Sequence, residues 1–206
     1  MHEEAGMCGR YYVDEKTADA AEHVFKQIGV KTDFHELCQT ALIPKDIHPG
    51  DAALVLKASR QGIVCCTQKW GLTGSGHGQL LINARCETAA EKKSFRNGIL
   101  KRRIVIPAAG FYEWNQSKEK NTFQRRDGRA AFIAGFYEKY EDGEHFIILT
   151  TAANSSVKTV HDRMPLILET DQILTWLTDD TRMGALMQKV PRELERRSDY
   201  EQLSLF

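Results

Sequence analysis

The sequence predicts an α+β fold that is rich in β-structure, and three observations support this prediction. A succession of short segments with β-type composition fills the middle of the chain, from about residue 102 to residue 153. Turn dipeptides separate these segments, and helical periodicity is confined to the regions on either side. Strands that follow one another through tight turns pair as antiparallel or mixed sheets, so we expect such sheets with flanking helices.

Length and composition are those of one globular domain. The 206 residues are 42% hydrophobic and 27% charged, enough to bury a core without a metal or disulfide staple. Lys plus Arg and Asp plus Glu number 28 each, so nucleic-acid binding must be argued from local clusters rather than from net charge. There is no run of about 18 apolar residues and no secretion signal, so we expect a cytoplasmic protein with no membrane partner.

The cysteines do not form a metal or disulfide pattern. They are odd in number and lack C-x-x-C spacing, which argues against both a zinc site and a disulfide framework. We therefore expect neither a metal nor a cofactor. The five positions are Cys8, Cys38, Cys65, Cys66 and Cys86.

The first predicted element is an amphipathic helix between Asp14 and Gly29. Asp14 can cap its start and Gly29 can end it. Between residues 52 and 72, two β-type runs flank a Gln61-Gly62 turn, and residues 80–85 form another short strand. The apolar positions of the helix share one face: Ala21, Val24, Phe25 and Ile28.

A second helix is predicted to begin at a capping-box pattern. Thr88 and Glu91 have the spacing of that pattern, and the helix would continue to about Leu100. In the strand-rich middle, the dipeptides Asp127-Gly128 and Asp142-Gly143 predict hairpin turns.

The last third of the chain returns to helices. A short turn leads to residue 161, a strand covers residues 163–169, and two helices span about 171–177 and 182–190, ended by Pro191. Residues 191–206 are mostly charged and are predicted to form a flexible tail. The domain itself is predicted over residues 8–190.

The sequence Met7-Cys8 has a chemical consequence. Initiation at Met7 and removal of that methionine would leave Cys8 as the amino terminus, which is a 1,2-aminothiol. Such a group captures an aldehyde first through nitrogen and then through sulfur, giving a thiazolidine ring. Residues 1–7 would then be a leader that is removed or not translated, because an acylated Cys8 nitrogen cannot form a Schiff base.

Three other residues are candidate partners of Cys8, although each also has an ordinary explanation. Asn83 could be a turn former at a strand end. Glu113 alternates with aromatic residues and could simply point to water from a half-buried strand. His161 could be a loop histidine beside an ion pair, and Cys8 could be a small buried hydrophobic residue.

Taken together, the segments around these residues resemble the SRAP family, the SOS-response-associated peptidase or abasic-site-processing domain. The matching segments occur in the family's order: MCGR (7–10), WGL (70–72), INARCET (82–88), Phe95, RRIVIPAAGFYEW (102–114), AGFYE (134–138) and VHDRMPLIL (160–168).

The resemblance implies a β-rich α+β fold with a groove for single-stranded DNA and a pocket for the terminal cysteine. It implies that the substrate is an abasic site, to which the protein becomes covalently linked during the response to DNA damage, at the nucleoid or replication fork. It assigns Cys8 as nucleophile and Asn83, Glu113 and His161 as its polar partners.

The chemistry of these groups fits those roles. An α-amine with a pKa of about 7.7 to 8.0 is partly unprotonated at neutral pH, so it can attack first. We expect His161 to protonate the sugar ring oxygen as a general acid and Glu113 to move protons during dehydration and thiol attack. Asn83 would orient Cys8 or the sugar, since an amide can donate and accept at once.

Four residues are candidates for DNA contact. Arg10, Arg85 and Arg163 each lie within two residues of a proposed catalytic group and could grip phosphates, although pairing with Asp162 or Glu87 is the alternative. Trp70 could stack on a base or could be a core residue at a strand end. The segment after residue 72 lacks the family's proline and second tryptophan, so we do not expect an aromatic wedge there.

The chain ends in a second motif. The residues Gln202, Leu203, Ser204, Leu205 and Phe206 resemble the short peptide that binds the bacterial replication sliding clamp. A flexible segment of this kind can order itself on a partner. The alternative is that it packs on its own domain.

Three functions are therefore compared. The first is an enzyme-like factor that links covalently to abasic sites in single-stranded DNA and shields them, with lyase-like or hydrolase-like character. The second is a thiol peptidase that acts on its own leader, with Cys8 as nucleophile. The third is a non-catalytic adaptor for single-stranded DNA or the clamp.

Overall fold

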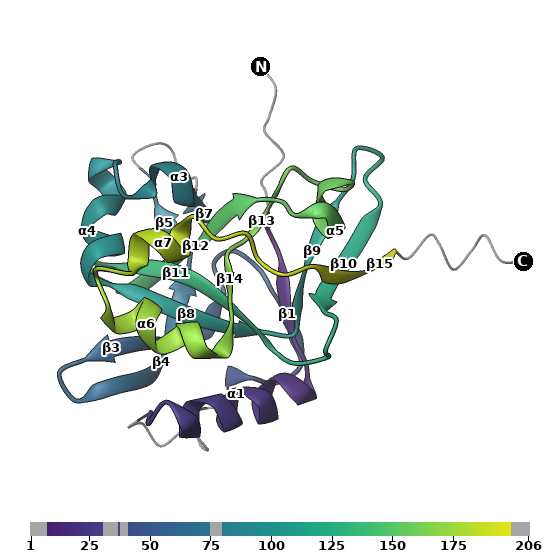
Figure 1. The fold of residues 1–206 in the computed structure, drawn as a ribbon. Coiled ribbons are helices and arrows are strands. Elements are labelled where there is room, and N and C mark those ends of the chain that lie inside the picture. The colour runs from purple at the N-terminus through teal and green to yellow at the C-terminus, as the bar shows by residue number, and fades with distance from the viewer. Residues whose placement is uncertain (1–7, 31–36, 38–40, 75–79, 199–206) are drawn as a thin grey trace, which may run out of the picture.

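The computed structural model describes residues 8–30, 37, 41–74 and 80–198. It confirms the α+β prediction, because two large sheets and a short hairpin are flanked by helices (Figure 1). The glycine-rich segment 75–79, the leader 1–7 and the clamp-like peptide 202–206 lie outside the described residues. Within the described part, no helix is long and apolar enough to cross a membrane.

The first sheet positions the start of the described chain. Its order is β15-β10-β9-β1-β2, and all of its neighbouring strands are antiparallel. Tyr11 in the first strand lies opposite Ile47 on one side and Phe111 on the other. The strands are β1 (Tyr11–Val13), β2 (Lys45–Ile47), β9 (Gly110–Trp114), β10 (Lys120–Arg125) and β15 (Leu194–Ser198).

The second sheet closes on itself. The strands β12, β4, β3, β8 and β11 follow one another, and a further pairing of β11 with β12 completes a small barrel. Three short strands attach to it: β7 and β13 to β12, and β14 to β11. The bounds are β3 (Ala52–Ser59), β4 (Gly62–Trp70), β7 (Asn83–Arg85), β8 (Arg103–Ala108), β11 (Ala131–Tyr140), β12 (Gly143–Ala152), β13 (Arg163–Pro165) and β14 (Ile167–Leu168).

The barrel strand β8 is buried at every position rather than at alternate ones. Helix α6 (Ile173–Thr178) packs against it, so neither of its faces meets water. The fully buried Trp176 of that helix donates its indole N–H to the carbonyl of Ile104 at 2.9 Å. This explains why the sequence RIVIPA is a continuous apolar run after its first residue.

The helices lie around the sheets in Figure 1, with α1 beneath them and α4, α6 and α7 on one side. The predicted first helix is confirmed: Asp14 caps it in a capping box with Thr17, and Gly29 follows its end with a φ of +70°. The helices are α1 (Glu15–Gln27), α3 (Cys86–Ala89), α4 (Lys93–Lys101), α5 (Ser155–Lys158), α6 (Ile173–Thr178) and α7 (Met183–Met187), with a 3₁₀ turn at Thr170–Gln172.

The predicted start of the second helix is wrong. Thr88 does not cap a helix but lies inside the short α3, and α4 begins later, after Lys92, without a side-chain cap. The backbone breaks between the two because α3 follows directly from β7, whose pairing with β12 fixes its direction. The predicted helix at 182–190 is also shorter, covering Met183–Met187.

The beginning of the predicted flexible tail is wrong as well. Residues Leu194–Ser198 form β15, which pairs with β10 along its whole length. Leu194 and Ser198 at its two ends are buried, and the three charged residues between them are partly or fully exposed. An edge strand with one wet face has the composition of a tail, so the sequence alone does not distinguish the two.

Candidate functional site

The proposed nucleophile and one proposed partner are in direct contact. The Cys8 backbone nitrogen donates to the Glu113 Oε1 at 2.7 Å. This contact follows from the pairing of β1 with β9, because Cys8 lies just before β1 and Glu113 lies on β9. Cys8 exposes none of its surface and Glu113 exposes 3%, so the pair is buried.

Burial changes the acid–base chemistry of Glu113. Desolvation raises the pKa of this carboxyl to about 8, and the negative charge of Asp162 also raises it, against the lowering effect of the Cys8 N–H. A carboxyl that titrates near neutral pH can give up and take back a proton under physiological conditions. The alternative explanation, a side chain that simply points to water, is excluded because Glu113 points into the protein.

The Cys8 thiol is protonated at neutral pH in this environment. Burial raises its pKa well above the ordinary value, and the neighbouring Glu113 carboxyl raises it further. The residue also has a φ of 45°, in the left-handed region that side chains other than glycine seldom adopt. An activated thiolate is therefore not what this chain presents at residue 8.

His161 has one ring nitrogen held by its own loop. The backbone N–H of Arg163 donates to Nδ1 at 3.1 Å, and an Asp162 carboxylate oxygen lies 3.1 Å from the same nitrogen. Nδ1 accepts from Arg163 only when it carries no proton and donates to Asp162 only when it carries one, so the two hydrogen bonds require different tautomers or protonation states of the ring. When Nδ1 accepts, the ring proton is on Nε2, which is then free to donate to a substrate.

The loop of His161 lies near the buried pair without touching it. Asp162 acts on the pKa of Glu113 and so lies within electrostatic range of that carboxyl. Across the described structure, however, His161 makes no hydrogen bond to Cys8 or to Glu113. His161 can therefore act on the chemistry of Cys8 and Glu113 only through a substrate bound between its ring and that pair.

Contacts of Trp70 connect the strand of Asn83 to the region of Cys8. Asn83 begins β7 opposite Ile148 of β12, and the carbonyl before it, that of Ile82, accepts the Trp70 indole N–H at 3.0 Å. The Trp70 ring lies 5.3 Å from the ring of Tyr11, three residues after Cys8. The indole therefore ties the strand of Asn83 to the strand that follows Cys8.

The predicted stacking of Trp70 on a DNA base is wrong. The side chain is fully buried, and its ring also stacks on Phe146 at 6.2 Å between centroids. A base cannot reach it. The second explanation given for this residue, a core tryptophan at a strand end, is the one that the structure supports.

The three arginines differ in how far they are already paired. Arg163 binds both carboxylate oxygens of Glu87, at 2.5 and 2.7 Å, which is the ion pair named as the alternative to phosphate contact. Arg10 lies 3.7 Å from the Asp46 carboxylate. Arg85 is exposed beside Asn83, so it is the most accessible of the three to a phosphate.

Tyr11 is a site residue that the sequence did not indicate. Its hydroxyl is buried without a hydrogen-bond partner, and burial together with Asp51 and Cys8 raises its pKa above the ordinary range. A tyrosine in an alternating strand carries no signal of such a role. The hydroxyl is close enough to Cys8 to interact with it electrostatically.

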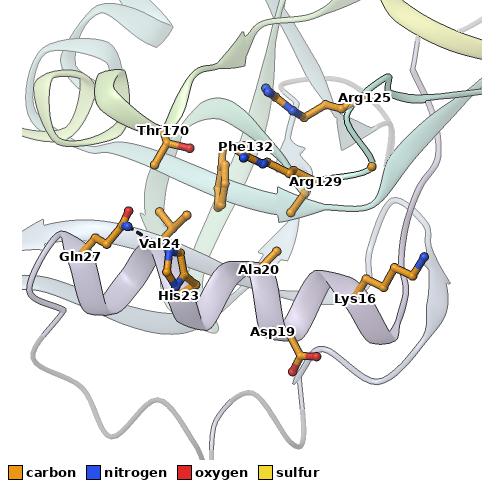
Figure 2. Close-up of a pocket in the computed structure, with 12 residues that line it drawn as sticks. Lys16, Asp19, Ala20, His23, Val24, Gln27, Arg125, Arg129, Phe132 and Thr170 are labelled. Atoms are coloured by element: carbon orange, nitrogen blue, oxygen red, sulfur yellow. Dashed lines mark hydrogen bonds between the residues drawn. The ribbon is translucent and has the colours of Figure 1, made fainter.

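A large pocket lies elsewhere. Figure 2 shows it between α1 and the segment that carries Arg125, Arg129 and Phe132, with a volume of about 700 Å³. None of the four proposed catalytic residues lines it. The described residues also include no group of three or more histidine, cysteine or acidic side chains that could hold a metal ion.

Comparison with known proteins connects this geometry with a family. The sequence profile described as SOS response associated peptidase (SRAP) matches residues 7–202. The chain is 34% identical over 139 residues to the abasic site processing protein YoaM of Bacillus subtilis, covering 62% of this chain and 61% of that protein. It is 29% identical over 143 residues to YedK of Escherichia coli, also called an abasic site processing protein, covering 66% and 64%.

These alignments span somewhat less than two thirds of the length of the relatives. Two solved structures share the fold at 21% identity. One is a protein from Bacteroides thetaiotaomicron with a TM-score of 0.74, covering 93% of this chain and 91% of that one. The other is a phage-related protein from Bordetella bronchiseptica with the same score, covering 93% of each chain.

Proposed function

The chain belongs to the SOS response associated peptidase (SRAP) family, and we propose that it captures abasic sites in single-stranded DNA through Cys8 as a terminal aminothiol. Curated relatives are named abasic site processing proteins. The observation that carries the proposal is the buried contact between the Cys8 nitrogen and the Glu113 carboxylate. That contact places an ionisable carboxyl, whose pKa is raised by burial, directly on the nitrogen that would attack.

The covalent step balances without any other reactant. The Cys8 amine adds to the aldehyde carbon of the opened sugar, and loss of one water gives an imine. The thiol then adds across the C=N bond, sulfur to carbon and hydrogen to nitrogen, closing a thiazolidine. The adduct therefore has the summed masses of protein and DNA less one water.

Glu113 has a role at each proton transfer. In its protonated form it can help water leave the carbinolamine. In its ionised form it can take the proton of the thiol, whose raised pKa makes such a base necessary. Asn83 would orient the nucleophile or the sugar. His161 would protonate the ring oxygen from Nε2 of its charged ring, in which the Nδ1–H donates to the Asp162 carboxylate at 3.1 Å.

The proposal requires a free nitrogen on Cys8. With residues 1–7 attached, that nitrogen is an amide and the residue is buried. We propose that the active form starts at Cys8, either by initiation at Met7 and removal of that methionine or by cleavage after it. The left-handed φ of Cys8 supports this, because the strain exists only while a preceding residue is attached.

A thiol peptidase acting on the leader is the competing function. It would need the Cys8 thiol as a thiolate, whereas burial and Glu113 hold this thiol in its protonated form. The capture reaction needs the amine first and the thiolate only afterwards. The structure therefore favours capture.

A denaturing gel with a single-stranded oligonucleotide that contains one abasic site tests the proposal. Protein beginning at Cys8 should give a shifted band whose mass is the sum less one water. Cys8→Ser and Cys8→Ala both keep the terminal amine and lack the thiol, so each should give only an imine that borohydride must trap. If protein that begins at Cys8 leaves the oligonucleotide unmodified, the proposal is wrong. Cleavage of the leader without a shifted band would favour the peptidase.

A further inference from the structure

The outward face of the first sheet carries a row of aromatic rings that begins beside the capture site. Tyr12 on β1 stacks on Tyr112 on β9, with centroids 5.1 Å apart and planes 24° from parallel. Trp114, two residues further along β9, lies 6.4 Å from Tyr112. All three side chains are partly exposed, and we call them the aromatic row.

Cations accompany the aromatic row. The Arg10 guanidinium lies over the Trp114 ring at 5.2 Å, and the Lys120 ammonium lies over the Tyr112 ring at 5.1 Å. The Asp46 carboxylate lies at the edge, where it accepts the Tyr112 hydroxyl at 2.9 Å and pairs with Arg10 at 3.7 Å. Asp14, Glu195 and Arg197 also lie within electrostatic range of the Tyr12 hydroxyl, at the far end of the row. Rings flanked by positive groups match a ligand with flat bases and an anionic backbone.

Strand alternation and a glycine in the first sheet allow the aromatic row to form. Strand alternation sends Glu113 inward to the Cys8 nitrogen and its neighbours Tyr112 and Trp114 outward. Gly110 lies opposite Tyr12, and a Cβ there would come within 2.9 Å of the Tyr12 ring. The Tyr12 ring therefore lies across bare backbone, in stacking contact with Tyr112.

We propose that the aromatic row is a stacking platform for unpaired bases that flank the lesion on one side of it. This inference rests on the proposed function, and it adds the path that the strand takes away from Cys8. Trp114 is the ring nearest to Cys8 along the paired strands, and Tyr12 is the far end, so the bases follow the row outward from the lesion. Bases within a duplex are stacked on each other, so the platform selects single-stranded DNA.

The first test needs no chemistry at the lesion. Fluorescence anisotropy would measure the affinity of the whole chain for undamaged, labelled oligo-dT. Tyr112→Leu should weaken binding roughly 5- to 150-fold, the range expected for one lost base stack. Tyr112→Phe keeps the ring and loses only the hydroxyl contact with Asp46, so it should bind within about twofold of the parent protein.

A matched control separates stacking from general damage to the surface. Tyr140 is also partly exposed and touches another ring, that of His145, but lies at the end of β11 in the barrel. Tyr140→Leu should leave the affinity unchanged. The proposal is wrong if Tyr140→Leu lowers the affinity for oligo-dT as much as Tyr112→Leu does. It is also wrong if Tyr112→Phe lowers that affinity as much as Tyr112→Leu does.

A second readout does not depend on a variant at Tyr112. Of the three tryptophans, Trp70 and Trp176 are fully buried, so quenching of intrinsic fluorescence by added oligo-dT reports on Trp114. Quenching should be strong in the parent protein and absent in Trp114→Phe. Full quenching in Trp114→Phe would contradict contact between the bases and the row.

The sidedness is tested with oligonucleotides that carry nucleotides only 5′ or only 3′ of an abasic site. With protein as the limiting component, Tyr112→Leu should lower the yield of linked product for one of these two oligonucleotides and leave the yield unchanged for the other. Dependence on both sides would refute a one-sided platform. Because lesion-free DNA is used above, failure of capture by Cys8 would leave that binding result intact, so the two proposals fail separately.

Discussion

At the scale of single residues, Glu113 determines the most about the site. Its carboxyl is buried at the end of a hydrogen bond from the Cys8 nitrogen, and burial holds its pKa near 8. A free amine at Cys8 would add a positive charge beside it and lower that pKa. Release of the nitrogen would therefore shift the pair towards an ionised carboxylate facing an ammonium, and the two would titrate together.

Burial of Glu113 also makes the stability of the full chain depend on pH. The ordinary pKa is 4.5 and the folded-state value is about 8, so between these values the folded protein holds a proton that the unfolded chain has lost. Stability is therefore highest below pH 4.5 with respect to this group, falls as the pH rises, and has lost the full amount above pH 8. Across this pH range the free energy of unfolding falls by roughly 3 to 5 kcal/mol at most.

We predict that Glu113→Gln removes this dependence. Glutamine keeps an oxygen to accept the Cys8 N–H but does not ionise, so the variant should be more stable than the parent at pH 9 by roughly 3 kcal/mol or more and close to it at pH 4.5. Chemical unfolding at the two pH values measures the difference. The exposed Glu141→Gln is the control and should change nothing; equal effects of the two substitutions would show that the Glu113 carboxyl is not desolvated.

At the scale of elements, the first sheet depends on close approach at Gly110. A Cβ there would lie 2.2 Å from the carbonyl oxygen of Phe123 on the neighbouring strand, and 2.9 Å from the Tyr12 ring. The first contact is with backbone, which cannot move without breaking the pairing of β9 and β10. The absence of a side chain at this position therefore determines how closely the sheet packs.

We predict that Gly110→Ala destabilises the fold by roughly 3 kcal/mol or more. The added methyl group would clash with backbone, which cannot move aside as a side chain could. Thermal unfolding should show a fall in Tm of roughly 6 °C or more for a chain of this size. Gly184→Ala in α7 is the matched control. A Cβ at Gly184 meets nothing within 4 Å, so alanine there should raise stability by up to about 1 kcal/mol through helix propensity. A neutral Gly110→Ala would show that β9 and β10 are less tightly paired than described.

Elements also show where local patterns suffice. The helix from Glu15 was predictable because its cap, periodicity and stop signal all lie within one stretch of sequence. The capping-box spacing at Thr88 misled because the pairing of β7 with β12 starts a helix two residues earlier. Tertiary pairing here overrides a local preference of about 1 kcal/mol.

At the scale of the whole molecule, the barrel and the first sheet gather residues from distant parts of the chain. Cys8 and Glu113 meet through β1 and β9, and Trp70 ties the strand of Asn83 to the same place. The β13 strand carries Arg163 beside β12, which leaves the loop of His161 near Glu113. The site therefore exists only when both sheets are formed.

The end of the chain carries the clamp-like motif. The described part ends at Ser198, at the edge of the first sheet, and the clamp-like peptide 202–206 follows it. We predict that deletion of residues 202–206 abolishes binding to a bacterial sliding clamp, measured by surface plasmon resonance, and leaves linkage to abasic DNA unchanged. Replacing Leu205 and Phe206 by alanine should have the same effect, and unchanged clamp affinity would refute the assignment.

The sequence by itself determined the fold class and most strands and turns, and its short motifs, through their resemblance to a family, predicted the four proposed catalytic residues. It did so because periodicity, turn chemistry and short motifs are written in neighbouring residues. Only the tertiary structure decided that Trp70 is core, that Arg163 is paired with Glu87, and that Leu194–Ser198 is a strand. It alone placed the Cys8 nitrogen on a desolvated carboxyl and aligned Tyr12 with Tyr112. Desolvation and strand register depend on segments about a hundred residues apart in sequence, and no local pattern records them.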